Sequence, residues 1–273
     1  MNDYSDLLMQ DADGIRHITL NRPEARNAMR PETLAQLEAV FGECAGREDL
    51  RAIVLRGAGG HFCAGADLKG LMAGGLKPPS VGEADPVIAV NRAFGTLLRA
   101  AEAVPQVLVT VCEGAVLGGG FGLACVSDIA LAHVDARFGM PETTRGLPPA
   151  QIAPFVVTRI GLTQARRLAL TGAQFGGTDA LRLGVVHELF DDDAALTRGL
   201  QSTLDAIRRC APRANALTKA IVLQVGQQDM DRVLDDAAAK FAACVRGTEA
   251  PEGIAAFMQK RPPAWAVPPE RTD

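Results

Sequence analysis

Aromatic residues are scarce in this sequence: they make up 4% of 273 residues, with a single Trp and a single Tyr. The core must therefore be built mainly from Ala, Leu and Val. An excess of charge of one sign is also lacking, because 28 basic and 32 acidic residues leave a formal net charge of −4. This balance gives no support for a nucleic-acid-binding surface.

Several familiar cofactor and targeting signals are missing. The six cysteines and four histidines show no Cys-x-x-Cys pair and no metal-ligand spacing, so we expect buried, reduced thiols, no metal and a cytoplasmic protein. Neither GxxxxGK[ST] nor GxGxxG occurs, which leaves ATP and NAD unsupported and predicts no cofactor. The acidic start shows no secretory signal. Only 104–126 approaches transmembrane length, and its Glu113 and five glycines favour a buried strand and turn, so no membrane partner is expected.

The stretch from Val107 to Asp128 organises the rest of the chain. Its β-branched run at 107–111 predicts a buried strand, which ends in a glycine turn at 118–122. Glycines let the backbone turn tightly and approach a substrate directly. If a helix begins there, its first N–H groups have no internal partner and suit an oxygen that develops negative charge. A turn with a purely structural role fits the same residues.

A second unit of the same kind lies upstream. An apolar strand at 52–56 leads into glycines at 57–60 and then into His61–Leu68, HFCAGADL. Two units of strand, glycine turn and helix could place two backbone donors around one point, as an oxyanion hole requires.

The remaining pattern predicts an α/β core followed by helices. Asp13-Gly14 predicts a hairpin between strands at 7–10 and 15–20, and Pro31 suits the first position of a helix. A surface loop at 74–84 precedes a helix capped by Asp85. The buried face of that helix is expected to carry Val87, Val90, Phe94, Leu97, Leu98 and Ala101. Further elements are expected at 129–132 and 185–190 (strands), and at 163–170, 178–183, 193–210, 214–227, 229–246 and 251–259 (helices).

Three segments, HFCAGADL, AVLGGGFG and FGMPETTRG, occur in an order and spacing that resemble the crotonase (enoyl-CoA hydratase/isomerase) superfamily. The resemblance extends over nearly the whole chain, from 20–28 to 253–261. It implies an α/β, crotonase-like (ClpP/crotonase) spiral of ββα units with an acyl-CoA thioester site in residues 1–195. It also implies a helical oligomerisation region, 196–273, that forms a homotrimer or a dimer of trimers.

The resemblance also assigns site residues. The backbone N–H groups of Ala66 and Gly119 would hold an enolate oxygen, and Glu142 would be the acid/base. Without the resemblance, Glu142 is more simply a surface glutamate, although apolar neighbours would raise its pKa. The implied coenzyme A groove contains Arg26, Ala64, Gly65, Asp67, Phe257 and Lys260, with Ala64 at the adenine and Arg26 and Lys260 at the phosphates. The implied acyl site contains Leu68, Gly118, Gly122 and Arg145.

One position departs from the pattern of short-chain hydratases, which carry a second glutamate where this chain has Gly122. Residues 145–157 also depart from their glycine-rich stretch. The chain is therefore more similar to the single-glutamate branch that acts on glutaconyl-CoA-type substrates, such as methylglutaconyl-CoA and isohexenylglutaconyl-CoA in leucine and acyclic-terpene breakdown. A free carboxylate on the substrate needs a cation, and Arg145 is the candidate, although an ordinary surface arginine fits as well.

These features favour a hydro-lyase that adds water to a 2-enoyl-CoA. Double-bond isomerisation uses the same oxyanion hole and needs one base and no water. Thioester hydrolysis or decarboxylation on the same scaffold, and an acyl-CoA-binding or RNA-associated protein, are further alternatives. Glu142 argues against an inactive binding protein, and the acidic net charge argues against RNA.

Overall fold

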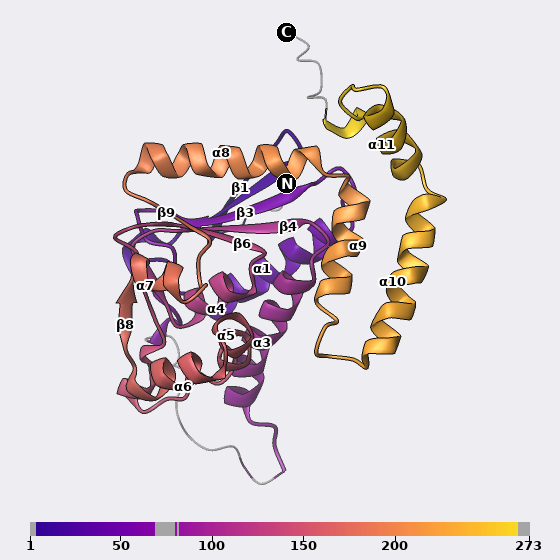
Figure 1. Cartoon of the computed structure of the whole chain (residues 1–273). Helices are drawn as coiled ribbons and strands as arrows, with labels where there is room; N and C mark the ends of the chain where they lie inside the picture. Colours follow the sequence, from indigo (N-terminus) through magenta and orange to yellow (C-terminus); the bar gives the residue numbers. More distant parts are fainter. Residues whose placement is uncertain (1–3, 69–79, 81, 267–273) are drawn as a thin grey trace.

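A six-stranded sheet, in the order β1-β2-β3-β4-β6-β9, forms the centre of the computed structural model, which describes residues 4–68, 80 and 82–266 (Figure 1). Strands β1 and β2 pair antiparallel, and the other neighbours in this sheet pair parallel. A second sheet has the order β5-β7-β8. The strands are β1 (Leu7–Ala12), β2 (Ile15–Leu20), β3 (Ala52–Gly57), β4 (Val107–Cys112), β5 (Ala115–Leu117), β6 (Ile129–His133), β7 (Arg137–Gly139), β8 (Gln174–Gly176) and β9 (Glu188–Phe190).

Helices cover both faces of the large sheet. Helix α8 lies along one face (Figure 1), where Leu196 and Leu204 pack with Val54 and Val109. Helices α1, α3 and α4 lie on the other face with the larger core. The helices are α1 (Pro31–Ala45), α3 (Pro86–Ala103), α4 (Gly119–Val126), α5 (Ala153–Ile160), α6 (Leu162–Thr171), α7 (Gly177–Arg182), α8 (Asp193–Arg209), α9 (Pro212–Val222), α10 (Met230–Val245) and α11 (Glu249–Met258), with short 3-10 turns η1 (Pro23–Ala25), η2 (Pro141–Arg145) and η3 (Ala264–Ala266).

The strongest local signals are confirmed. Asp13 and Gly14 both have positive φ, 52° and 74°, as a tight hairpin turn requires. Helix α1 begins at Pro31, and the Asp85 carboxylate accepts a hydrogen bond from Val87 N at 2.8 Å at the start of α3. The runs at 52–57 and 107–112 are central strands, because a strand buried on both faces reads as a continuous apolar run.

Two predictions about buried segments are wrong in part. Val87 and Val90 are 42% and 41% exposed, because α3 meets the core only in its second half, from Phe94 onward. In the predicted strand at 185–190, only the last three residues pair with β6. Val185 and Val186 are buried instead in a turn, where their N–H groups donate to Ala180 O.

The helices after Phe190 form where expected, except that α9 ends at Val222. The boundary predicted near 195 stays a prediction, and it would fall in the first turn of α8, a helix that packs against the sheet. Cys44, Cys63, Cys112 and Cys125 are buried as expected, whereas Cys210 is exposed. In the described part of the chain, no helix is long and apolar enough to cross a membrane. The loop predicted at 74–84 lies largely outside the described residues.

Candidate active site

The first glycine turn ends in a segment, 62–67, whose backbone is almost fully hydrogen-bonded. In chain order, its acceptors at 2.8–3.4 Å are Glu113 O, Ala115 O, Arg26 O, Cys63 Sγ and Met29 O. These acceptors serve every N–H of the segment except that of Ala66, which has none among the described residues. Because Ala66 is also exposed, its N–H is available to an oxygen from outside the chain.

The second glycine turn leaves a matching donor. Helix α4 begins at Gly119, whose N–H is the first of the helix and has no acceptor in the described part of the chain. The preceding Gly118 donates to Gly139 O at 2.9 Å and has φ 52° and ψ −117°, a conformation that residues with a Cβ avoid. The glycine therefore fixes the direction in which the Gly119 N–H points.

The two turns meet where both lack side chains. A Cβ placed on Gly65, which has φ 102°, would lie 3.7 Å from Gly119 N and 3.6 Å from Gly118 Cα. Gly65 directly precedes Ala66, so the two unpaired donors belong to adjoining segments. Glycine is favoured at position 65 because of its positive φ and because a Cβ there would also lie 3.1 Å from Leu117 O.

Glu142 faces the same point. It lies in η2, and its Oε1 would be 2.8 Å from a Cβ on Gly118. Its Oε2 is buried and has no hydrogen-bond partner among the described residues. Burial raises the pKa of Glu142, against smaller lowering effects of its own backbone N–H and of Arg145. A buried carboxyl group with one oxygen unused is suited to exchange a proton with a ligand.

Apolar side chains enclose the Gly119 donor. A Cβ on Gly119 would lie 2.7 Å from Met29 Cε and 3.0 Å from Phe94 Cζ. The helical pattern predicted Phe94 on a buried helix face, and nothing in the sequence indicated that Met29 or Phe94 belongs to the site. Their position was unpredictable because they come from α3 and from the loop before α1, far from the glycine turn in sequence.

At position 122, where this chain lacks the second glutamate, there is no room for a side chain. A Cβ on Gly122 would lie 2.6 Å from Ile152 Cγ2 and 3.4 Å from Leu98 Cδ1. Ile152 is 3% exposed at the start of α5. Two features therefore exclude a carboxylate from this position: residue 122 is a glycine, and the side chain of Ile152 occupies the space beside it.

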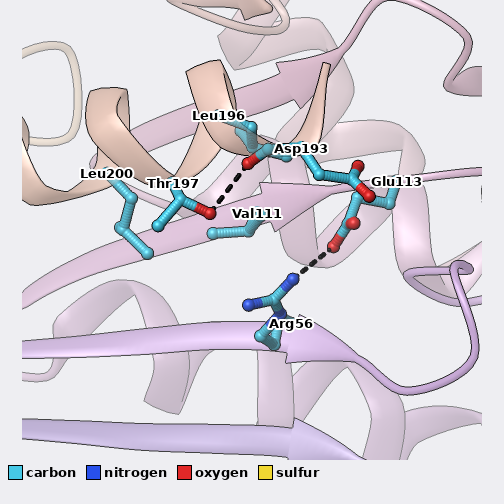
Figure 2. A pocket seen from close by; sticks show the side chains of 7 residues that line it. All are labelled: Arg56, Val111, Glu113, Asp193, Leu196, Thr197 and Leu200. Carbon is cyan, nitrogen blue, oxygen red and sulfur yellow. Dashed lines mark hydrogen bonds and ion pairs between the residues drawn. The ribbon is translucent and has the colours of Figure 1, made fainter.

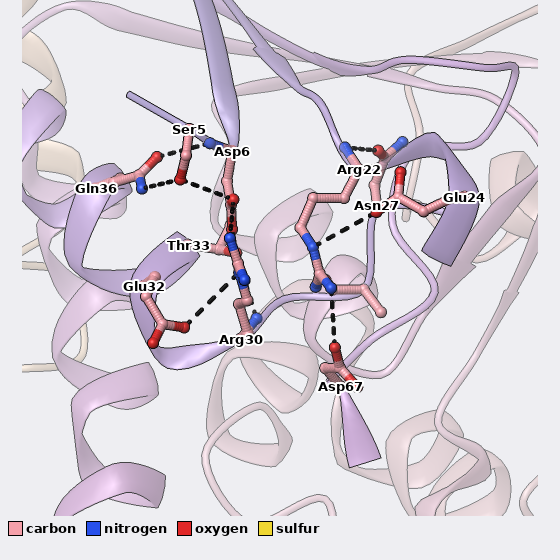
Figure 3. A network of polar contacts seen from close by, with 11 residues as sticks. Ser5, Asp6, Arg22, Glu24, Asn27, Arg30, Glu32, Thr33, Gln36 and Asp67 are labelled. Carbon is pink, nitrogen blue, oxygen red and sulfur yellow. Dashed lines mark hydrogen bonds and ion pairs between the residues drawn. The ribbon is translucent and has the colours of Figure 1, made fainter. Parts of the chain in front are cut away.

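Four of the residues expected in the coenzyme A groove are gathered at the first turn. Ala64 N–H donates to Arg26 O at 3.0 Å, so only the Ala64 carbonyl is left for a ligand. The Asp67 carboxylate forms an ion pair with Arg22 at 3.0 Å (Figure 3). Gly65 lies between them, and half-buried Leu68 follows Asp67.

Polar contacts fix this part of the chain. Asn27 Nδ2 donates to the carbonyls of Ala58 and His61, which ties residues near Arg22 to the first turn. Beside them, the Arg30 guanidinium lowers the pKa of buried Asp6 to about 2 (Figure 3).

Phe257 and Lys260 do not join the groove within one chain. Phe257 is 86% exposed near the end of α11, and Lys260 follows the helix. Helix α11 lies beyond α9 at the edge of the molecule, away from α4 (Figure 1). The expectation that both residues contribute to the groove is therefore not met by a single copy of the chain.

Arg145 is exposed in η2, three residues after Glu142, and has no ion-pair partner in the described part of the chain. Its charge contributes to lowering the pKa of Glu142, which opposes the effect of burial. It is therefore available to an anionic group that approaches Glu142.

A separate cavity of about 100 Å³ lies between the sheet and α8 (Figure 2). Arg56 and Glu113 pair across it at 2.9 Å, and Val111 and Leu196 place it on the α8 side of the sheet. The glycine turns and Glu142 are not among its lining residues, and it has room for a few waters rather than for an acyl chain.

The fold and the site together define a class of protein. An α/β scaffold that places two backbone N–H groups, unpaired among the described residues, beside a half-buried carboxyl group is equipped to stabilise an oxyanion while a proton is moved.

Similarity to known proteins in sequence and in structure supports this class of protein. The family described as enoyl-CoA hydratase/isomerase matches residues 10–268. The structure of Pseudomonas aeruginosa AtuE is 55% identical, with a TM-score of 0.92 over 96% of this chain and 100% of that one. An enoyl-CoA hydratase/isomerase from Marinobacter aquaeolei is 51% identical, with a TM-score of 0.92 over 96% of this chain and 99% of that one. The 2,3-dehydroadipyl-CoA hydratase of Escherichia coli is 29% identical over 95% of this chain and 98% of its own length.

The chain therefore belongs to the enoyl-CoA hydratase/isomerase family and has the α/β crotonase fold, with two sheets and C-terminal helices. Members of this family act on acyl-CoA thioesters, which accounts for a site that can hold a thioester oxygen.

Proposed function

We propose that this protein is a hydro-lyase that adds water across the double bond of a branched, glutaconyl-type 2-enoyl-CoA. One observation carries the proposal: the N–H groups of Ala66 and Gly119, unpaired among the described residues, adjoin the carboxyl group of Glu142, whose buried Oε2 also has no partner there. An unsatisfied buried polar group costs about 1–3 kcal/mol, so such groups persist where a ligand uses them.

In the proposed mechanism, the thioester oxygen accepts hydrogen bonds from both backbone donors. The Glu142 carboxylate takes a proton from water while the water oxygen bonds to C3. The electron pair of the double bond moves onto the thioester, which becomes an enolate held by Ala66 and Gly119. Glu142 then returns the proton to C2, so that one water is added and the carboxylate is regenerated. Each backbone donor of this kind contributes about 2.7–4 kcal/mol to the transition state.

The glutaconyl-type substrate is supported by two features of the site. Gly122 and Ile152 leave Glu142 as the single carboxyl group of the proposed mechanism. Exposed Arg145 offers a cation to a distal carboxylate. The Escherichia coli relative is named for the thioester of a dicarboxylic acid, a substrate of the same charge type.

Double-bond isomerisation is the second candidate, and the single carboxyl group favours it. A base that removes a proton from one carbon and returns it to another needs no water and no second acid. Removal of that proton gives a dienolate of the thioester, whose oxygen the same two donors would hold.

The assembly we propose is a homotrimer or a dimer of trimers. The C-terminal helices and the loop between α9 and α10 carry large apolar side chains that are half or more exposed, which favours contact with other copies. These residues are Val222, Val225, Met230, Leu234, Phe241, Val245, Ile254, Phe257 and Met258. For Phe257 and Lys260 to serve a coenzyme A groove, a neighbouring copy must supply them. The unpaired cysteines support a cytoplasmic location as part of the same proposal.

Mass spectrometry of the acyl-CoA products tests the proposal. Wild type and Glu142→Gln are each given 3-methylglutaconyl-CoA and crotonyl-CoA. Gain of one water on the branched substrate, lost in the variant, is the expected result. Water gain on crotonyl-CoA alone would contradict the substrate, unchanged mass with a shifted double bond would establish an isomerase, and free CoA would establish a hydrolase. Loss of carbon dioxide would indicate decarboxylation, whereas binding of both thioesters without conversion would indicate a binding protein.

A further inference from the structure

Cys63 joins the two glycine turns through its backbone. Its N–H donates to Ala115 O at 2.8 Å, and its carbonyl accepts from Leu117 N at 2.9 Å. The first turn is therefore paired with β5, the strand that leads into Gly118 and Gly119.

The Cys63 side chain contacts both turns as well. Its Sγ accepts a hydrogen bond from Gly65 N at 3.4 Å. Burial raises the pKa of this thiol, and the N–H groups of Gly65 and Gly120 partly offset that rise. A Cβ on Gly120 would lie 2.7 Å from Cys63 Cβ, so the cysteine fills the space beside that glycine completely.

Each of these two contacts is one residue away from an unpaired donor. Gly65 precedes Ala66, and Gly120 follows Gly119. We propose that Cys63 is a positioning residue, whose thiol fixes Gly65 and Gly120 and thereby the directions of the Ala66 and Gly119 N–H groups. The inference rests on the proposed function, because it gives these donors an enolate oxygen to hold.

The thiol suits this position because it stays neutral. Complete burial raises the pKa of Cys63 to about 12. The sulfur can therefore accept hydrogen bonds near the oxyanion site without placing a second negative charge beside the enolate.

Kinetics of three variants test the role. Cys63→Ala removes the sulfur, and Cys63→Ser retains a hydrogen-bond acceptor. Cys112→Ala is the matched control, since Cys112 is equally buried but its sulfur contacts Thr110, away from both turns. We expect Cys63→Ala to lower kcat about three- to tenfold with little change in KM, because donors aimed at the enolate act mainly in the transition state. Cys63→Ser should recover most of that loss, and Cys112→Ala should leave kcat unchanged.

A binding experiment separates positioning from general packing. Acetoacetyl-CoA forms an enolate without further reaction, and its ultraviolet absorbance reports the ionised fraction on the enzyme. Cys63→Ala should raise the apparent pKa of the bound ligand relative to wild type and to Cys112→Ala, whereas a structural role alone would shift only the thermal unfolding temperature. If Cys63→Ala does not fold, Cys63→Ser is compared with Cys112→Ser instead. Because serine retains a hydrogen-bond acceptor, Cys63→Ser should ionise the bound ligand nearly as well as wild type.

The outcomes are distinguishable. Wild type that binds acetoacetyl-CoA without ionising it would overturn the proposed function. Wild type that ionises it, with kcat and enolate fraction unchanged in Cys63→Ala, would overturn the positioning role alone.

Discussion

Gly122→Ala tests directly whether Ile152 forms a closed wall beside Gly122 in the candidate active site. The added methyl group would lie 2.6 Å from Ile152 Cγ2 and 3.2 Å from Ile152 Cβ. A favourable carbon–carbon contact needs about 3.5–4.0 Å, so Ile152 or α4 must move. Ile152 is buried and β-branched, and both properties restrict its movement.

Two opposing effects determine how far Gly122→Ala changes the free energy of unfolding. Overpacking of a filled core costs about 1–3 kcal/mol. Position 122 lies inside α4, where alanine in place of glycine stabilises the helix by about 0.5–1 kcal/mol. The steric effect wins, and we expect a net loss of about 1–2 kcal/mol in the free energy of unfolding.

Urea unfolding of a double-mutant cycle with Ile152→Ala isolates the contact. Truncation of Ile152 removes Cγ2, so Gly122→Ala should cost less in that background, with a coupling energy of about 1 kcal/mol or more. Protein concentration must be equal across the cycle, because assembly would make stability concentration-dependent. Unchanged or increased stability of Gly122→Ala in the wild-type background would refute the closed wall, and with it the reason for a single carboxyl group.

Three further predictions concern the reaction. Burial raises the pKa of Glu142, so the carboxylate that serves as the base is lost as pH falls through that raised pKa. The acid limb of the kcat/KM profile should therefore lie above the ordinary glutamate range. It should vanish in Glu142→Gln, in which kcat should fall about 10²–10⁴-fold. Gly119→Val should lower kcat about a hundredfold or more while the protein still folds, and near-normal turnover would remove the oxyanion assignment. Arg145→Met should raise KM for 3-methylglutaconyl-CoA but not for crotonyl-CoA, with exposed Arg166→Met as control; equal effects on both substrates would reject a carboxylate contact.

Much of the fold was predictable because its strongest elements carry local signals. The central strands read as continuous apolar runs, and Pro31 and Asp85 mark helix starts. Strands β5, β7 and β8 have three residues each, too few to show an alternating pattern. The exposure of Val87 shows another limit, because an apolar stripe does not tell how far the core beneath a helix extends.

The site was predictable where it is made of backbone. Motifs at 61–68 and 118–122 identify the turns, because glycines there are needed for close approach. The walls were not predictable, since Ile152 reaches Gly122 from 30 residues away in the chain. Nor could the sequence tell that Phe257 lies on an outer helix, as that depends on how α9, α10 and α11 are arranged.

The unpaired groups of the site are best understood from what surrounds them. Every neighbouring N–H in segment 62–67 has an acceptor, so the unused donor at Ala66 is an exception within a saturated network. A flexible loop could satisfy such a donor by moving, but pairing with β5 and Met29 prevents this. No acceptor among the described residues therefore reaches this donor, and in a ligand-filled site it needs no reorganisation when charge develops. The rigidity that leaves the group unpaired is thus the same property that would make it effective in catalysis.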